Sequence, residues 1–126
     1  MNSVNSVNSV KIIVPGRPVP KGRPRLGVRG REVYIYTPPE TKEYEEFVGW
    51  VAKFAGCKPI SGPVEVEIWC YLKGKADVDN LCKSILDGLN RIAYKDDDQV
   101  VDLYVHKRRV KKRTEERVEI EIREAG

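Results

Sequence analysis

Two aspartates separated by a single residue, Asp77 and Asp79, are the side chains of this sequence best suited to bind a metal ion. They stand at a predicted turn between a strand and a helix, where both carboxylates can point into one shallow site. Carboxylate oxygens suit hard cations, and Mg²⁺ accepts one or two of them while it keeps several waters. A second acidic cluster, residues 96–98, follows one predicted helix later. A third carboxylate from this cluster could complete the metal site.

The segment after the aspartate pair predicts a helix with a lysine on its polar face. Asn80, Lys83 and Asp87 lie on that face, and Lys83 lies one turn from Asp79 because residues three and four apart are neighbours on a helix surface. A lysine beside a carboxylate pair is a catalytic arrangement. The buried face is predicted from an apolar stripe at helical spacing: Leu81, Ile85, Leu86, Leu89, Ile92 and Ala93.

A purely structural role for these acids is the alternative. Aspartate is a good helix N-cap, so Asp77 or Asp79 could simply cap the helix, which would explain one of the two residues. Residues 96–98 could form a solvated acidic loop, because blocks of like charge are commonly exposed. From the residues alone, both the metal site and these structural roles stay open.

Composition indicates a single globular domain with a polyanionic partner. The 126 residues include 40% hydrophobic and 33% charged ones, which suits one core, and the net charge of +4 favours binding to an anionic polymer. No run of eighteen apolar residues exists and the N-terminus is polar, so neither a membrane span nor a signal peptide is predicted, and the cytoplasm is the expected location.

The metal-binding residue types other than acids are predicted to be structural. The three cysteines, Cys57, Cys70 and Cys82, lack the C-x-x-C spacing of a zinc site and are expected to be reduced, mostly buried thiols of a cytosolic protein. The lone His106 is expected to be a surface residue rather than a ligand.

Two basic segments, residues 11–31 and 107–113, flank the acidic centre. Prolines and glycines between residues 17 and 25 predict a stiff loop that loses little entropy when it grips phosphates; a solvated linker is the alternative. Residues 107–113 are predicted to form a basic hairpin arm. The candidate phosphate-binding residues are Lys21, Arg23, Arg25, Arg108 and Lys111.

The spacing of apolar residues predicts the helices and strands of the fold. Residues 64–72 alternate between apolar and polar side chains and form the clearest strand. A helix is expected from Thr37, as N-cap, to Gly56. Further strands are expected at residues 11–14, 32–36, 99–105 and 116–123.

Residues 25–36 are expected to form a turn and a strand. The turn covers residues 25–31 around Gly27 and Gly30, and the strand carries Tyr34 and Tyr36. Both tyrosines could stack on bases, but packing in the core or on a sheet is the favoured interpretation.

The N-terminal residues 1–10 repeat the triplet Asn-Ser-Val, a period that matches neither helix nor strand. They are predicted to be a mobile low-complexity tract before a domain that spans residues 11–126. Extension of the first strand backwards into the tract is the alternative.

The motifs resemble those of the RusA-type Holliday junction resolvases, over about residues 11–124. Asp77-x-Asp79-Asn80-x-x-Lys83 is similar to the family's D-x-D-N-x-x-K motif, and residues 96–101 are similar to its D-D-x-Q-V-V motif. Residues 18–25 are similar to the family's basic N-terminal loop. The resemblance implies that Asp77, Asp79 and Asp97 bind the metal and that Lys83 is the essential lysine. Asp98 stands at the position that the motif leaves free, so Asp97 and Asp98 are both candidates for the third ligand.

The resemblance also implies a fold and partners. The fold would be a compact single α/β (α+β) domain with a mixed β-sheet and two main α-helices, and the predicted order of elements agrees with it. Members are Mg²⁺-dependent homodimers that cut four-way junctions, and a two-fold dimer offers two equivalent sites for two equivalent strands.

The chemistry expected from these residues is metal-assisted phosphodiester hydrolysis. Lys83 would stabilise charge on the phosphorane or protonate the leaving oxygen, and electrostatic stabilisation is the favoured role. One alternative is a magnesium nuclease for flaps or forks. The other is a catalytically inactive nucleic-acid-binding module that uses only the basic segments.

Overall fold

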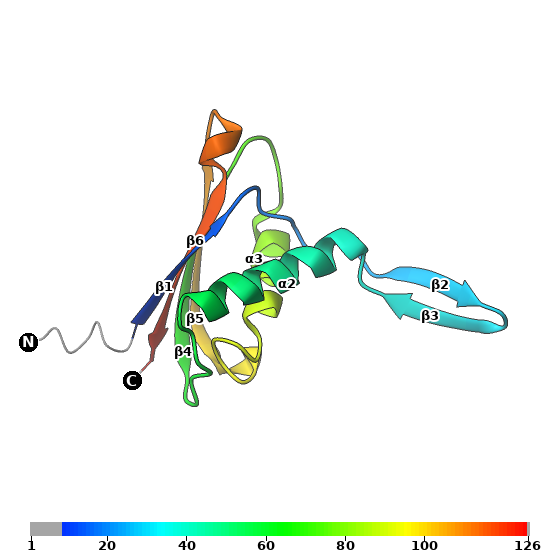
Figure 1. The fold of residues 1–126 in the computed structure, drawn as a ribbon, viewed down its shortest axis with the longest axis horizontal. Coiled ribbons are helices and arrows are strands. Elements are labelled where there is room, and N and C mark those ends of the chain that lie inside the picture. The colour runs from blue at the N-terminus through cyan, green and yellow to red at the C-terminus, as the bar shows by residue number, and fades with distance from the viewer. Residues whose placement is uncertain (1–8, 126) are drawn as a thin grey trace, which may run out of the picture.

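The computed structural model describes residues 9–125, and its body is one mixed four-stranded sheet (Figure 1). The strands lie in the order β1-β6-β4-β5; β4 and β5 are parallel, and the other neighbours are antiparallel. A parallel pair needs a long crossover connection, and here it contains a helix. The strands are β1 Ser9–Pro15, β4 Val64–Leu72, β5 Val100–Arg109 and β6 Arg117–Glu124.

Two helices, α2 Pro39–Phe54 and α3 Val78–Leu89, lie on one face of the sheet (Figure 1). Alternate residues of β4 point into the core between the sheet and these helices, and all are buried: Val64, Val66, Ile68, Cys70 and Leu72. Leu81, Ile85 and Leu89 of α3 are also fully buried, as the apolar stripe predicted. The expected α/β (α+β) class, a mixed sheet with two main helices, is confirmed.

Two glycines let α2 and α3 pack closely. A Cβ on Gly88 would lie 2.8 Å from the carbonyl oxygen of Glu45, and a Cβ on Gly49 would lie 3.1 Å from that of Gly88. Any larger residue at position 88 would therefore push the helices apart. This contact fixes α3, which carries Asp79 and Lys83, against the rest of the domain.

Several element boundaries differ from the expected ones. The N-cap of α2 is Pro38 rather than Thr37, with no side-chain cap bond, although the chain does turn at Gly56, where φ is +91°. Helix α3 ends at Leu89, four residues before the end of the apolar stripe. Strand β5 continues to Arg109, so the first half of the predicted basic hairpin arm is a strand of the sheet.

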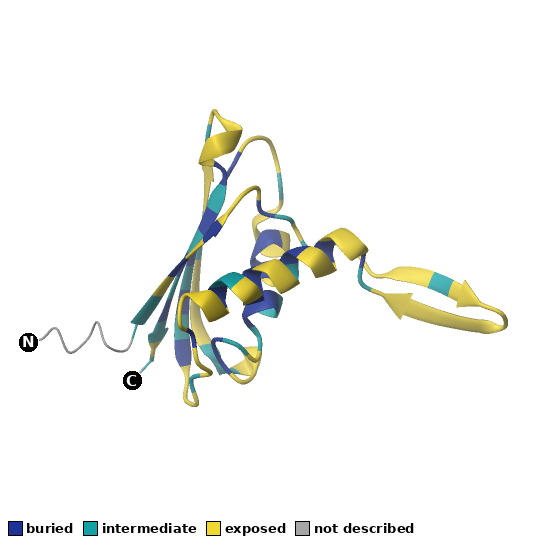
Figure 2. Ribbon diagram, viewed as in Figure 1, coloured by how far each residue is buried: buried dark blue, intermediate teal, exposed yellow. Residues whose placement is uncertain are grey.

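A separate two-stranded ribbon, the β2–β3 arm, projects from the body beyond the N-terminal end of α2 (Figure 1). It consists of β2 Arg25–Arg29 and β3 Glu32–Tyr36 and is exposed along almost its whole length (Figure 2). The expected turn over residues 25–31 is wrong, because Arg25–Arg29 pairs with β3 and only the tip at Gly30 turns, with φ at +63°.

The N-terminal tract overlaps the fold at its end. Ser9 and Val10 belong to β1 and pair with Arg123 and Ile122 of β6, so the first strand begins before residue 11. The rest of the predicted mobile tract, residues 1–8, lies outside the described residues. Between residues 9 and 125, no helix has both the length and the apolar composition that crossing a membrane requires.

Candidate active site

Asp79, Lys83 and Asp97 line one pocket of about 300 Å³, named here the Asp79 pocket. Asp79 and Lys83 come from α3, and Asp97 begins the short 3-10 helix η1, Asp97–Gln99, that leads into β5. Residues separated by up to 18 positions in the sequence thus share one hollow, as the motifs predicted. The pocket is lined by Val78, Asp79, Cys82, Lys83, Leu86, Asp87, Asp97, Leu103 and Val105.

Asp77 occupies the N-cap position of α3, but its side chain makes no capping hydrogen bond. Its carboxylate instead accepts a long hydrogen bond of 3.5 Å from the side-chain amide of Asn80. A capping role, the structural alternative for this residue, would require a bond to a backbone N–H at the start of the helix. The exposed carboxylate of Asp77 is therefore not used to stabilise the helix in that way.

The acidic residues 96–98 have different surroundings. The Asp96 carboxylate accepts from the backbone N–H of Asp98, and the Gln99 side chain accepts from the backbone N–H of Asp96, so these two residues form a capping box. Asp97 lines the Asp79 pocket, whereas Asp98 is not among its lining residues. All three aspartates are exposed, as the solvated-loop interpretation expects, and Asp96 in addition caps η1.

The expected three-carboxylate metal shell is not assembled among residues 9–125, where no three acidic, histidine or cysteine side chains group closely enough to hold an ion. Three carboxylates, Asp79, Asp87 and Asp97, line the pocket, while Asp77 lies outside its lining. Asp87 is already paired with Lys21, which leaves Asp79 and Asp97 as the candidate ligands. This donor set still suits Mg²⁺, which is commonly held by one or two carboxylates with waters and substrate phosphates as the other ligands.

One wall of the Asp79 pocket is apolar and is formed by Cys82, Leu86, Leu103 and Val105. Burial, together with the negative charge of Asp79, raises the pKa of the Cys82 thiol to about 11, so the thiol is neutral near pH 7. All three cysteines are buried and free, which confirms their predicted structural role. An apolar wall strengthens electrostatic interactions inside the pocket because it lowers the local dielectric.

Lys21 was predicted to bind a phosphate, but in the structure its ammonium is bound by other residues of the protein. Its ammonium donates to Glu45 of α2 at 2.6 Å and to Asp87 of α3 at 2.8 Å, and its side chain is only 20% exposed. Burial lowers the pKa of Lys21, but its bonds with Asp87 and Glu45 raise it more, so the net shift is upward from 10.5. Its backbone N–H also donates to the carbonyl of Asn80. Lys21 therefore ties the basic loop to the helix that carries Asp79.

Lys21→Met is expected to lower the free energy of unfolding by about 2 kcal/mol, because it leaves two half-buried carboxylates without their cation. Urea denaturation measures the loss, and Lys58→Met, at an exposed lysine, is the control with little expected change. Since the pKa of Lys21 is raised, the difference from wild type persists up to about pH 10.5 and declines only above it. Equal, small losses in both variants would contradict the structural role.

The turn before Asp77 is held by residues that the sequence interpretation missed. Glu116 is buried, accepts from the backbone N–H of Lys73 at 2.9 Å and pairs with Arg17 at 2.8 Å. The bond from Lys73, and then the Arg17 guanidinium, lower the pKa of Glu116. Lys107 of β5 donates to the carbonyl of Ala76 at 2.7 Å. No local pattern indicates these contacts, since the partners are distant in sequence.

Gln99 is a second missed residue. Its side-chain amide donates to the carbonyl oxygens of Ile60 and Gly62, both at 2.7 Å, and its oxygen accepts from the backbone of Lys95 and Asp96. It therefore locks η1, and with it Asp97, to the loop before β4. An acid followed by glutamine three residues later is a capping-box pattern, which could have indicated this role.

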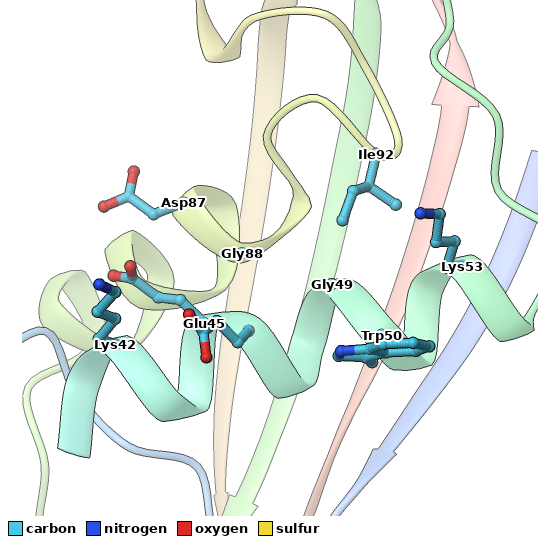
Figure 3. A pocket seen from close by; sticks show the side chains of 9 residues that line it. Lys42, Glu45, Gly49, Trp50, Lys53, Asp87, Gly88 and Ile92 are labelled. Carbon is cyan, nitrogen blue, oxygen red and sulfur yellow. The ribbon is translucent and has the colours of Figure 1, made fainter. Parts of the chain in front are cut away.

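A larger hollow of about 540 Å³, the α2–α3 groove, lies on the other side of Asp87 (Figure 3). It contains none of the predicted catalytic residues, and two of its three carboxylates, Glu45 and Asp87, are already paired with Lys21. Its size alone therefore does not make it the reactive site. It is lined by Lys42, Glu45, Glu46, Gly49, Trp50, Lys53, Asp87, Gly88 and Ile92.

His106 lies away from the Asp79 pocket. Its ring stacks on Trp69 with centroids 5.4 Å apart, and its Nε2 lies 2.7 Å from a carboxylate oxygen of Glu67. It is not among the residues that line the pocket. Its contacts are those of a side chain packed on the sheet.

Comparison with known proteins assigns the chain to a family. A family model described as "Endodeoxyribonuclease RusA" matches residues 15–123. The chain is also similar to the uncharacterized protein YqaN of Bacillus subtilis strain 168, with 35% identity over 144 residues that cover 95% of this chain and 99% of the relative. The family match includes α3, η1 and β5, the elements that line the Asp79 pocket. The chain therefore belongs to the RusA endodeoxyribonuclease family.

Proposed function

We propose that this protein is a Mg²⁺-dependent endonuclease that resolves four-way DNA junctions by paired nicking, as a homodimer. Membership of an endodeoxyribonuclease family supplies the reaction class. The observation that carries the proposal is that Asp79, Lys83 and Asp97 line one pocket. A two-fold dimer would place two such pockets on the two equivalent strands of a junction.

Asp79 and Asp97 would hold the ion, with Asp77 close in sequence to complete the ligand set when DNA is bound. Bound there, Mg²⁺ would supply a nucleophilic water at neutral pH and neutralise charge on the phosphate. Two acidic ligands leave room for waters and phosphate oxygens. Asp97 is proposed rather than Asp98 because only Asp97 is among the lining residues.

Lys83 would stabilise the transition state. Its ammonium carries a positive charge in the same pocket as the candidate metal ligands Asp79 and Asp97, where negative charge on the phosphate oxygens would increase as the water attacks. A preorganised cation beside an apolar wall is more effective than one in water. Leu86, Leu103 and Val105 form that wall and would exclude bulk water from the scissile bond.

Arg23, Arg25, Arg108 and Lys111 are proposed to hold the DNA backbone. All four are exposed. Arg25 pairs with Glu40 at 2.8 Å, but both side chains are more than half exposed, so the pair contributes little and can exchange for a phosphate. Lys21 is excluded from this set because its ammonium is bound within the protein.

The Arg23→Ala/Arg25→Ala variant is expected to flatten the salt dependence of DNA binding. Each arginine that grips one phosphate contributes about 0.9 to the log–log slope on duplex DNA, so the slope should fall by up to about two units. Binding titrations at several salt concentrations measure it, with Lys58→Met, at an exposed lysine outside both basic segments, as the control that keeps the wild-type slope. An unchanged slope in the double variant would show that the loop is a solvated linker.

The substrate class is tested by comparing cleavage of a mobile four-way junction, a flap and a linear duplex of the same sequence. The proposal expects the four-way junction to be cut fastest, with paired nicks on strands of like polarity. Faster cleavage of the flap would instead make the protein a nuclease for other branched DNA, with the same residues in the same roles.

A further inference from the structure

The strand register of the β2–β3 arm sorts its side chains into two unlike faces. Residues directly opposite one another across an antiparallel pair share a face. Two cross-strand pairs, Leu26 with Ile35 and Val28 with Val33, therefore form one wholly aliphatic face. The opposite face carries Arg25 with Tyr36, Gly27 with Tyr34 and Arg29 with Glu32. The arm thus has an aliphatic face and a tyrosine–arginine face.

The tyrosine–arginine face is built to present an aromatic surface. A Cβ at Gly27 would collide with the ring of Tyr34, so glycine is the residue that lets this ring lie across β2. The ring of Tyr36 follows with its centroid 5.8 Å away, and the guanidinium of Arg29 lies 5.8 Å from the Tyr34 centroid. Of the two kinds of packing expected for these tyrosines, the structure shows packing on a sheet rather than in the core, and the residues are 43% and 37% exposed.

Nothing in the described part of the chain covers the aliphatic face. Leu26, Val28, Val33 and Ile35 are each 65–71% exposed, and the arm projects away from the body (Figures 1 and 2). A lone two-stranded ribbon is marginally stable in water, and a contiguous exposed apolar patch marks a binding surface. The face therefore needs a partner with apolar surface.

The charge of the arm points to nucleic acid as that partner. Residues 25–36 contain three arginines and one glutamate, a net charge of +2. Apolar surface in DNA is the flat face of the bases, which stacking hides in a duplex and which a branch point exposes. A second copy of the arm would bring like charges together, and four aliphatic residues are far fewer than the roughly 20–30 per side of a standard interface.

We propose that the β2–β3 arm enters the branch point of a DNA junction and gives the protein its preference for branched DNA. The aliphatic face would lie against the exposed end of a base-paired arm, as apolar wedges do at unstacked steps. Tyr34 and Tyr36 would stack on unpaired bases, and the arginines would contact the flanking phosphates. This inference rests on the proposed function.

The anchoring of the arm explains how such binding would place the reactive site. The loop that leads into β2 is held by Lys21, which bonds to Asn80, Glu45 and Asp87, and by the backbone N–H of Gly22, which donates to Thr41 at 3.0 Å. These contacts join the base of the arm to α2 and to α3, which carries Asp79 and Lys83. Insertion of the arm would therefore position the Asp79 pocket near the branch.

The test compares two arm variants in EDTA, so that binding is measured without cleavage. Val28→Thr/Val33→Thr makes the aliphatic face polar and keeps strand-forming residues; Tyr34→Val removes one stacking ring. Each should weaken binding to a four-way junction about tenfold and change binding to a linear duplex less than about twofold. A 2-aminopurine base at the branch should brighten when wild-type protein unstacks it and brighten less with either variant.

Ile13→Thr is the matched control, because Ile13 is a 61% exposed aliphatic residue on β1, outside the arm. It should bind both DNAs like wild type. Variants that keep the wild-type ratio of junction to duplex affinity would overturn the role of the arm. Equal weakening on both DNAs with loss of self-association in sedimentation would also overturn it, because a second copy would then cover the face. A wild-type protein with no preference for the junction would instead contradict the proposed function, and the arm's role with it.

Discussion

Asp79→Asn is expected to abolish cleavage of a four-way junction and to leave junction binding within about twofold of wild type. The substitution removes one negative charge from a pocket that Asp79 shares with Asp97 and Lys83. A neutral amide is a weaker ligand than a carboxylate for a hard cation, so the reaction loses its metal. The proposed DNA grip lies elsewhere, in the basic loop, the arm and the end of β5, and is not changed by this substitution.

Asp98→Asn is the matched control for that experiment. It is the same chemical change, on an exposed aspartate that does not line the pocket. The control should cleave at close to the wild-type rate, and circular dichroism should show both variants folded. If Asp79→Asn lost binding and cleavage together, with reduced stability, Asp79 would be a structural residue of the first helical turn. If Asp98→Asn were inactive, Asp98 rather than Asp97 would be the third ligand.

Lys83→Ala is expected to lower the turnover rate by about a hundredfold or more, the scale for removing one preorganised charge or donor from an active site. Binding should change little, because in the proposed mechanism Lys83 would contact the reacting phosphate rather than the extended DNA backbone. Single-turnover cleavage at saturating protein separates the two effects, since the rate then reports chemistry alone.

Lys53→Ala provides the control, at an exposed lysine that lines the α2–α3 groove instead of the Asp79 pocket. It should leave turnover unchanged. Wild-type turnover in Lys83→Ala would remove the catalytic assignment and leave Lys83 as a surface neighbour of Asp87, one helical turn away.

The body of the fold followed from local patterns, because its elements have one buried face each. Strand β4 alternates buried and half-buried residues along its whole length, and α3 buries the predicted stripe from Leu81 to Leu89. These patterns are properties of neighbouring residues and can be recognised in a sequence. The same patterns placed Asp79 and Lys83 on one side of α3, whereas Asp97 was expected at the site from the resemblance of its motif.

The position of Asp97 depends on contacts between residues that are distant in the sequence. Asp97 reaches the pocket because β5 runs parallel to β4, with Val100 opposite Val64, and because Gln99 anchors η1 to residues 60 and 62. Nothing in the sequence around Lys21 indicated that its ammonium pairs with Glu45 and Asp87. For the same reason Lys21 was predicted to bind phosphate, although its side chain joins the basic loop to α2 and α3.

In the β2–β3 arm, β3 has the predicted bounds, but β2 was mispredicted as a turn for a physical reason of its own. Glycine in a strand normally weakens it, so Gly27 favoured a turn. In the structure Gly27 makes room for the ring of Tyr34 on the opposite strand, a pairing that only the register reveals. Exposed aliphatic and aromatic side chains also violate the rule that such residues are buried. Departures of this kind are expected where a surface serves a partner rather than the fold.

The most direct test of metal-dependent junction cleavage is to incubate wild-type protein with a labelled synthetic four-way junction, in Mg²⁺ and in EDTA. We expect paired nicks in Mg²⁺, no nicks in EDTA, and retention of the protein–junction complex in EDTA on a native gel. Junction binding in both conditions without nicks in Mg²⁺ would contradict the proposed function and would leave a nucleic-acid-binding module without catalysis.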